Sequence, residues 1–558
     1  MLRFPLALAL AALALPAHAQ VVTDQTGTPA KNEIITAPLP QDQAAMKAHV
    51  MFLATDAMQG REAGSHEYDI AAQYVAAQFY AAGLRPAGDD GGYLQRVPLT
   101  TFKLADHGSF TLTGPDGTAT PLVFGEDYVP SANAALATTD LSAPLVFVGF
   151  GIDAPGEGHD DYAGVDVTGK IVVFMNGVPE DLHSEIRATL GRASSKAEMA
   201  ARRGAIGAIV IDNPTGGRSF PFSALAANWQ RGATTWVDRE GNGHSPSAAA
   251  PMLATISRDS AARLFAGAPT SWEEIAAKAG DTSTKFKAFP LATSLHAVVN
   301  TEREDFVSYN VGGLIPGSDP DLADEVVVLT AHLDHVGVGR PDASGDTIYN
   351  GAEDNAVGIA SLIEEAKRFQ ASGEPPRRSV LFLAVTAEEK GLVGSDYFAN
   401  NPTLPDHRLV ADVNLDMPIL TYDFQDIIAF GADRSTLGPI VRKAAEDAGV
   451  GYSPDPMPEQ SLFVRSDHYR FVQQGIPSVF VWPGYAGDGE KGTNAFFADH
   501  YHKPSDEVGQ SPAIDWAAGV RFINVNYQIA REIADADQTP VWNKGDYFGT
   551  LYEGPMAD

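Results

Sequence analysis

Seven acidic and imidazole residues of the 558-residue chain lie next to apolar segments in its second half. They are His332, Asp334, Asp354, Glu388, Glu389, Asp416 and His502. The apolar segments are typical of buried strands and cover 325–332, 379–389, 409–416, 426–430 and 476–482. Asp354 instead precedes the segment 356–369, whose spacing of apolar residues predicts a helix. Because the carboxyl ends of parallel strands meet at one edge of a sheet, we expect these side chains to converge there.

Five of these seven side chains are carboxylates, and carboxylates that end hydrophobic strands lose hydration unless a cation compensates them. The basic residues directly adjacent in sequence are Lys390 and Lys503, and two ammonium groups are too few for five carboxylates. Divalent cations would compensate the charge of these carboxylates better than the two ammonium groups. Taken alone, each residue could equally be a helix cap or a solvated loop residue. Their recurrence in one region is what indicates a site.

The composition is that of a soluble globular protein, with 44% hydrophobic and 20% charged residues. Lys and Arg together number 39 and Asp and Glu 71, which gives a formal net charge of −32. So acidic a chain lacks the basic surface that phosphates require, and we therefore expect no nucleic-acid partner. The chain has no cysteine, which excludes disulfides and thiol nucleophiles. Any metal must be held by His, Asp and Glu.

Two regions of different character follow one another along the chain. From about residue 300 to 534, strand and helix patterns alternate, which predicts an α/β domain with a mixed, mainly parallel sheet flanked by helices. The stretch 104–296 is rich in Gly, Ala, Asp and short β segments and contains no cluster of candidate ligands. We predict that it forms a separate β-rich module.

The first 20 residues have the pattern of an export signal. One basic residue precedes an apolar run, and Ala-His-Ala at 17–19 has the small-x-small form of a cleavage site. We predict a signal peptide over 1–19 and a flexible lead-in over 20–43. An exported protein without disulfides is typical of a bacterial periplasm, so we expect a periplasmic or secreted protein. No later segment has the apolar length of a membrane span.

The segments AHLD, AEDNAVG, AEEKGLVGS, NLDM, SDHYRF and YHKPSDE, in this order, resemble the M28 family of dinuclear zinc peptidases. That family includes bacterial aminopeptidases and glutamate carboxypeptidase-type enzymes. The middle module resembles a protease-associated (PA) domain through GVDVTGKIVVF and KAEMAARRGAIGAIVI. The resemblance implies an N-terminal peptidase part over 44–103, an inserted PA-like domain over 104–296, and the main peptidase part over 297–558.

The resemblance also implies a set of metal ligands. One zinc ion would be held by His332 and Asp416, and the other by Glu389 and His502. Asp354 would bridge the two ions. His335 and His500 lie beside these residues in sequence, and we expect neither to be a ligand.

Three further residues receive catalytic roles from the resemblance. Glu388 would be the general base, which takes a proton from the attacking water and passes it to the leaving amine. Tyr501 would stabilise the oxyanion. Asp334 lies two residues from His332, and we expect its carboxylate to accept the imidazole N–H. The loop 465–468 would line the substrate cleft without an assigned role.

We expect an aminopeptidase that hydrolyses N-terminal residues of peptides, because loop 483–499 carries more acidic than basic residues to receive an α-ammonium group. A glutamate carboxypeptidase-type enzyme is the alternative, since Arg465 could receive a substrate carboxylate. An M20-type carboxypeptidase has similar ligands, but its lid domain is inserted between the last two. A glutaminyl cyclase shares the fold and typically uses one metal. A non-catalytic peptidase-like binding protein would be expected to lack ligands, and all five are present.

Overall fold

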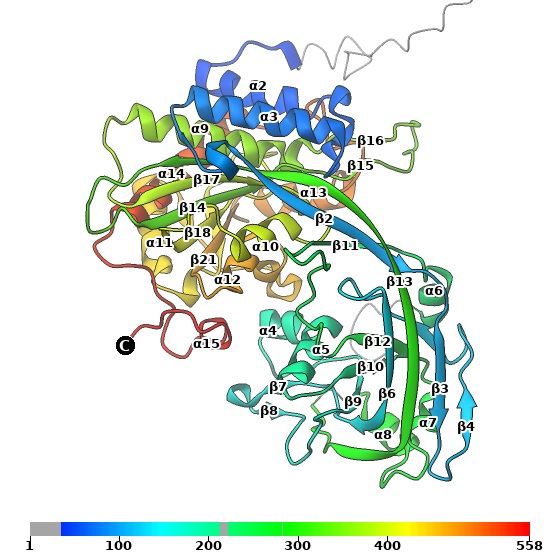
Figure 1. The fold of residues 1–558 in the computed structure, drawn as a ribbon. Coiled ribbons are helices and arrows are strands. Elements are labelled where there is room, and N and C mark those ends of the chain that lie inside the picture. Colours follow the sequence, from blue (N-terminus) through cyan, green and yellow to red (C-terminus); the bar gives the residue numbers. More distant parts are fainter. Residues whose placement is uncertain (1–34, 213–220, 282) are drawn as a thin grey trace, which may run out of the picture.

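The computed structural model describes residues 35–212, 221–281 and 283–558. The predicted signal peptide over 1–19 and the first part of the lead-in lie outside these residues. Figure 1 shows a larger lobe with a helix-covered sheet and a smaller, strand-rich lobe, joined by two long strands. In the described part of the chain, no helix combines the length and the apolar character that crossing a membrane requires.

The larger lobe is built on one mixed sheet. Its strands are β1 (Arg85–Pro86), β2 (Leu94–Leu104), β11 (Ala233–Trp236), β13 (Phe289–Ile315), β14 (Glu325–His332), β17 (Ser379–Val385), β18 (Arg408–Asn414), β19 (Asp426–Phe430), β20 (Gly451–Tyr452) and β21 (Ser478–Pro483). They pair in the order β11-β2-β13-β17-β14-β18-β21-β19-β20, and β1 pairs with β13. The four neighbours β17, β14, β18 and β21 run parallel to one another. The predicted mixed, mainly parallel α/β sheet is therefore confirmed.

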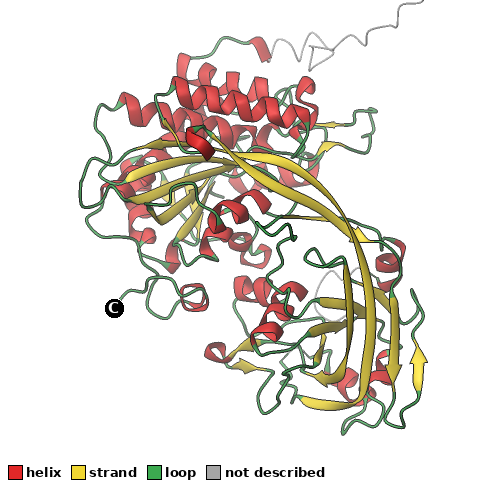
Figure 2. Ribbon diagram, in the orientation of Figure 1, coloured by secondary structure: helices red, strands yellow, loops and turns green. Residues whose placement is uncertain are grey.

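Helices cover both faces of this sheet (Figures 1 and 2). They are α2 (Gln41–Leu53), α3 (His66–Ala81), α9 (Val357–Ala371), α10 (Val393–Asn400), α11 (Leu437–Asp447), α12 (His468–Val472), α13 (Gly489–Asp499) and α14 (Trp516–Asp535). The short helix α15 (Tyr547–Leu551) lies near the C-terminus, apart from the sheet. In β14, Val327 and Leu329 pack with residues of α2, α3, α9 and α14. Val326 and Val328 pack on the opposite side with residues of α10 and α12. A strand buried on both faces reads as a continuous apolar run, which is why β14 could be predicted with its observed bounds.

The smaller lobe has its own sheet, in the order β4-β3-β13-β6-β9-β10-β12-β5. Its further strands are β3 (Ser109–Thr113), β4 (Ala119–Pro121), β5 (Tyr128–Pro130), β6 (Thr138–Phe147), β9 (Ile171–Met175), β10 (Gly207–Ile211) and β12 (Met252–Ile256). Short helices flank it: α4 (Ser184–Leu190), α5 (Ala193–Arg202), α6 (Phe222–Ala227), α7 (Ala261–Leu264) and α8 (Trp272–Lys278). A two-stranded hairpin joins β7 (Asp153–Ala154) to β8 (His159–Asp160).

Strand β13 belongs to both lobes. Residues 294–298 pair with β3 and β6 in the smaller lobe, residues 301–311 pair with β2, and residues 311–315 pair with β17 in the larger one. The expected domain boundary at 296 therefore falls inside a continuous strand. The two lobes share hydrogen-bonded backbone instead of a linker.

A second connection between the lobes centres on Arg434. Its guanidinium donates to Glu185 of α4 in the smaller lobe and to Asp546 before α15. The same guanidinium lies over the rings of Phe463 and Phe548, 5.4 and 4.9 Å from their centroids. Arg434 thus ties α4, the C-terminal segment and the turn around residue 463 together.

We predict that Arg434→Gln lowers the midpoint of thermal unfolding by several °C. Glu185 and Asp546 would lose their cationic partner while 10% and 7% exposed, and breaking a buried ion pair costs about 3 kcal/mol or more. The matched control is Arg442→Gln, because Arg442 and its partner Asp433 are both exposed. Equal midpoints for the two variants in differential scanning calorimetry would contradict the role of Arg434.

Candidate metal centre

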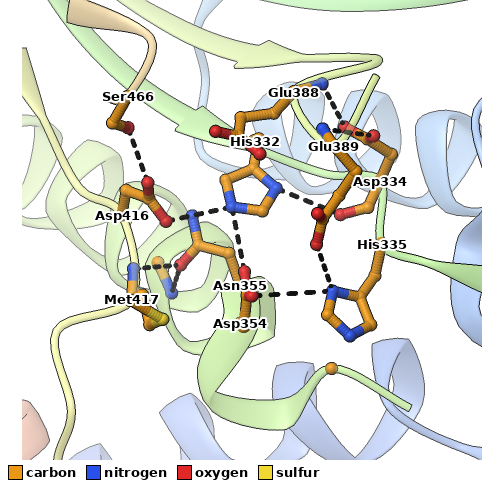
Figure 3. A network of polar contacts seen from close by, with 12 residues as sticks. His332, Asp334, His335, Asp354, Asn355, Glu388, Glu389, Asp416, Met417 and Ser466 are labelled. Atoms are coloured by element: carbon orange, nitrogen blue, oxygen red, sulfur yellow. Dashed lines mark hydrogen bonds and ion pairs between the residues drawn. The ribbon is translucent and has the colours of Figure 1, made fainter. Parts of the chain in front are cut away.

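The predicted site residues lie at the carboxyl end of the parallel strands. His332 is the last residue of β14, Glu388 and Glu389 follow β17, and Asp416 follows β18. Asp354 lies in the turn of Ala352–Ala356 that leads into α9, and its peptide bond to Asn355 is cis. The chain leaves β21, forms α13 and reaches His502 directly after it. Segments far apart in sequence are thereby brought together at one edge of the sheet, as Figure 3 shows for most of these residues.

The five predicted ligands meet, and the two oxygens of Asp354 face different imidazoles. His332 Nε2 lies 3.2 Å from Asp354 Oδ1 and 3.0 Å from Asp416 Oδ1. His502 Nε2 lies 3.2 Å from Asp354 Oδ2 and 3.2 Å from Glu389 Oε2. Each half of the site therefore has one imidazole and one carboxylate of its own, and both halves use Asp354.

Glu388 and Glu389 are neighbours in sequence but differ in their electrostatics. Burial raises the pKa of Glu388 well above its usual range, and the nearby Asp416 and Glu389 carboxylates add to this. Burial and Asp354 also act to raise the pKa of Glu389, but His335 and His502 outweigh them and the pKa falls to about 2. Two carboxyl groups whose surroundings separate their pKa values are suited to different tasks. Glu389 stays an anion, while Glu388 can hold a proton.

Asp334 does not act through its carboxylate on His332, and this prediction is wrong. The imidazole Nδ1 of His332 lies 3.1 Å from the backbone carbonyl oxygen of Asp334. The carboxylate instead accepts hydrogen bonds from the backbone N–H groups of Glu388 and Glu389, at 3.1 and 3.3 Å. Strand β14 ends at His332, so the rule that residues two apart share a strand face no longer holds at Asp334. Asp334 thus positions the loop that carries both glutamates.

Arg61 is a buried residue of this region that the sequence did not reveal. Its guanidinium donates to the carbonyl oxygens of Leu53, Leu333, Asn350 and Gly351, at 2.6 to 3.1 Å. Burial lowers the pKa of Arg61 to about 10, with nearby carboxylates opposing this. In the sequence, Arg61 lies in the segment QGREAG, far from the motifs that carry the predicted ligands. Arg61 fixes the two loops that flank His332 and Asp354.

Asp506 and Asn355 hold the loops of the site against one another. The Asp506 carboxylate accepts from the backbone N–H groups of Glu353 and Asp354, at 2.8 and 3.0 Å. The Asn355 side chain accepts from the N–H of Met417 and donates to the carbonyl of Leu415, on both sides of Asp416. The His502 loop is therefore bonded to the Asp354 turn, and that turn to the Asp416 loop. Asp506 lies in the segment YHKPSDE and Asn355 in the segment AEDNAVG, but the sequence predicted no role for either residue.

Asp416 has two further hydrogen-bonding partners. Ser466 donates its hydroxyl to Asp416 Oδ2 at 2.5 Å, which gives the predicted cleft loop 465–468 a positioning role. Trp482 donates from its indole N–H to the backbone carbonyl of Asp416 at 2.8 Å. With Oδ2 bound by Ser466, Oδ1 remains directed to His332.

A pocket opens beside these residues. Its acidic and imidazole side is formed by His332, Asp354, Glu388, Asp416 and His502, and its apolar side by Met417, Leu462, Phe480, Trp482 and Phe497. Tyr501 also lines it and stacks on His502, with ring centroids 3.9 Å apart. Burial raises the pKa of the Tyr501 phenol, which therefore keeps its proton at neutral pH. Arg465 is the basic residue of the lining and has no ion-pair partner in the described parts of the chain.

The donor set fits divalent cations. His332, Asp354 and Asp416 form one group of potential ligands, and His335, Asp354 and Glu389 form another. Three buried atoms, His335 Nδ1, His335 Nε2 and Glu389 Oε1, have no hydrogen-bond partner in the described parts of the chain. Buried polar atoms without partners are costly, and carboxylates outnumber imidazoles here. Cations between these donors would compensate both, and nitrogen and oxygen donors suit zinc.

Comparison with known proteins agrees with this site. Residues 310–529 match peptidase family M28, a segment that includes all five predicted ligands, and residues 141–254 match the PA domain. The larger lobe contains an M28 peptidase domain. The PA match lies within the smaller lobe, so the suspected pairing of an M28 domain with a PA domain is confirmed.

Individual proteins that resemble this chain share only 19% to 29% of their aligned residues with it. The probable leucine aminopeptidase 2 of Aspergillus oryzae is 29% identical over 203 residues, 35% of this chain and 38% of that protein. The probable glutamate carboxypeptidase VP8 of Zea mays is 24% identical over 515 residues, 84% of this chain and 65% of that protein. The chain thus spans less than two thirds of the length of these relatives. The solved aminopeptidase from Aneurinibacillus sp. strain AM-1 is 19% identical, with a TM-score of 0.45 over 91% of this chain and 97% of that one.

We predict that Asp506→Asn weakens metal binding by about 10- to 100-fold, because an amide offers one acceptor oxygen where two N–H groups need one each. Competition with a chromogenic chelator measures this affinity. Asp499→Asn is the control, since Asp499 is exposed and lies only three residues before His502. Unchanged affinity in Asp506→Asn would show that its two hydrogen bonds do not support the metal centre.

Proposed function

We propose that the protein is an exported, zinc-dependent aminopeptidase that removes N-terminal residues from peptides with the help of two metal ions. The observation that carries this proposal is the position of Asp354, whose two carboxylate oxygens face His332 and His502 separately. His332 and Asp416 would hold one ion, Glu389 and His502 the other, with Asp354 shared. Export is supported by the sequence pattern of residues 1–20.

The residues around the ligands have the properties that peptide hydrolysis requires. When bound, the ions would polarise the scissile carbonyl and make a water molecule more acidic. Glu388 lines the pocket, and its raised pKa suits a group that takes a proton from the attacking water and delivers it to the leaving amine. Tyr501 keeps its phenolic proton and can donate it as a hydrogen bond to the developing oxyanion.

The surroundings of the pocket favour an aminopeptidase over a carboxypeptidase. The segment 483–499, whose Phe497 lines the pocket, carries more acidic than basic residues, and its carboxylates can receive the α-ammonium group of a free N-terminus. Arg465 supports the second candidate, a carboxypeptidase, because an unpaired guanidinium could receive a substrate carboxylate. The names of the relatives include both candidate activities, a probable leucine aminopeptidase and a probable glutamate carboxypeptidase. The excess of acidic residues in segment 483–499 decides our choice for the aminopeptidase.

Glu388→Gln is expected to lower kcat by about 10²- to 10⁴-fold while the zinc content stays that of the wild type. An amide of the same shape cannot accept the proton, and Glu388 is not one of the proposed ligands. The measurements are steady-state hydrolysis of an aminoacyl chromogenic substrate and metal analysis of the same preparation. Glu374→Gln, an exposed residue distant in sequence from the site, is the matched control. Near-normal turnover of Glu388→Gln would refute the general-base role.

A panel of free and N-acetylated peptides tests the choice of exopeptidase. We expect release of the N-terminal residue from free peptides, at least 10-fold slower release from acetylated ones, and no release after treatment with a chelator. The expected loss follows from the missing ammonium charge, since ionic hydrogen bonds contribute about 1.5–3 kcal/mol. Release of C-terminal residues from acetylated peptides would instead support the carboxypeptidase.

A further inference from the structure

His335 is held rigidly beside the metal centre. Its side chain is fully buried, and its backbone N–H donates to the carbonyl of Arg61 at 3.3 Å. The ring packs on Gly351, where a Cβ atom would lie 2.6 Å from Cγ and Cδ2 of the imidazole. Gly351 also has a φ of +61°, which favours glycine. The backbone on both sides therefore fixes the direction of the ring.

The ring is directed at two carboxylates without being hydrogen-bonded to either. His335 Nδ1 lies 2.8 Å from Glu389 Oε1 and 3.9 Å from Asp354 Oδ2, as drawn in Figure 3. Even so, neither His335 Nδ1 nor Glu389 Oε1 has a partner that meets hydrogen-bond geometry in the described residues. Two buried polar atoms this close would normally bond to each other. Their arrangement indicates that both face a common third group.

The chemistry of that third group follows from the donors around it. They are one ring nitrogen of His335 and carboxylate oxygens of Asp354 and Glu389. An imidazole nitrogen and carboxylate oxygens can all offer lone pairs to a metal ion. The group that suits all three is a cation that accepts nitrogen and oxygen donors.

We propose that His335 Nδ1 is itself a ligand of the metal ion held by Asp354 and Glu389. This rests on the proposed metal centre and adds a sixth residue to its five predicted ligands. The ion would have two imidazoles, His335 and His502, whereas the other ion has His332 alone. It departs from our expectation from the sequence that His335 is no ligand.

The two imidazoles of this ion differ in how firmly they are held. His502 is 39% exposed and has a left-handed φ of 52°, whereas His335 is buried and fixed by Gly351 and Arg61. His335 would therefore be the more firmly held nitrogen donor of this half, whereas His502 stacks on Tyr501 at the pocket.

The test compares His335→Asn with wild-type protein in metal binding rather than in activity. Both are stripped of metal and titrated with zinc against a chromogenic chelator, and their cobalt absorption spectra are recorded. We expect one of the two sites to weaken by at least 10-fold and the other to be unchanged, with an altered cobalt spectrum for the weakened site. We also expect a smaller rise of the unfolding midpoint on adding zinc. Two sites of wild-type affinity in His335→Asn would overturn the proposal.

His500→Asn is the matched control. His500 is also buried and close in sequence to a ligand, but its Nδ1 lies 2.9 Å from the Ser505 carbonyl and its Nε2 3.2 Å from the Ser511 carbonyl. Both ring nitrogens thus have hydrogen-bond partners within the chain, and the Ser505 hydroxyl also lies 3.1 Å from Nδ1. We expect this variant to bind two zinc ions like the wild type, and loss of a site in both variants would count against a specific role of His335.

X-ray absorption of the wild-type zinc protein keeps the test independent of how variants fold. We expect the spectrum to show three imidazole ligands for the two zinc ions together. A total of two imidazole ligands would overturn the proposal. Failure of the metal centre itself would look different, because wild-type protein would then bind fewer than two ions. Failure of the aminopeptidase assignment would leave all of these binding results in place.

Discussion

The repulsion among carboxylates at one edge of the sheet is the constraint on which the rest of the molecule depends. Asp354, Glu388, Glu389 and Asp416 are crowded around three imidazoles, and the carboxylate of Asp334 lies beside the two glutamates. Such a cluster is unstable unless cations compensate it and the surrounding backbone holds it in place. The sheet therefore only brings the ends of the strands close together. Hydrogen bonds in the loops determine where the carboxylate and imidazole side chains finally lie.

Those hydrogen bonds are made by buried polar residues that contact backbone rather than substrate. Arg61, Asp334, Asn355 and Asp506 together fix the loops that carry the predicted ligands. The backbone is also strained nearby, since Ala387 and Met417 have positive φ values of 55° and 48°. Strain of this kind persists only where the surroundings determine the conformation, and it is common at functional sites.

The sequence was sufficient for the features that depend on regular periodicity. Strands β14 and β19 have the predicted bounds, because an apolar run buried on both faces has few other interpretations. The five predicted ligands were singled out because they lie close to apolar segments, and their roles as ligands come from the resemblance to M28 peptidases and stay predictions. Arg61 could not be found in this way, since its partners are carbonyl oxygens that no sequence pattern reveals. The role of Asp334 was missed because the strand ends before it, and the orientation of His335 depends on Gly351, sixteen residues away.

The long strand β13 has a mechanical consequence for how substrates reach the pocket. Eleven of its residues form a ladder with β2 between the lobes, and its two ends are built into different sheets. Rotation of one lobe as a rigid body would shear that ladder, as well as the Arg434 contacts on the other side of the junction. The two lobes are therefore joined rigidly at two places, and the junction does not act as a hinge. Because every residue that lines the pocket belongs to the larger lobe, we expect access to it to depend on side chains and short turns at its mouth rather than on rotation of the lobes.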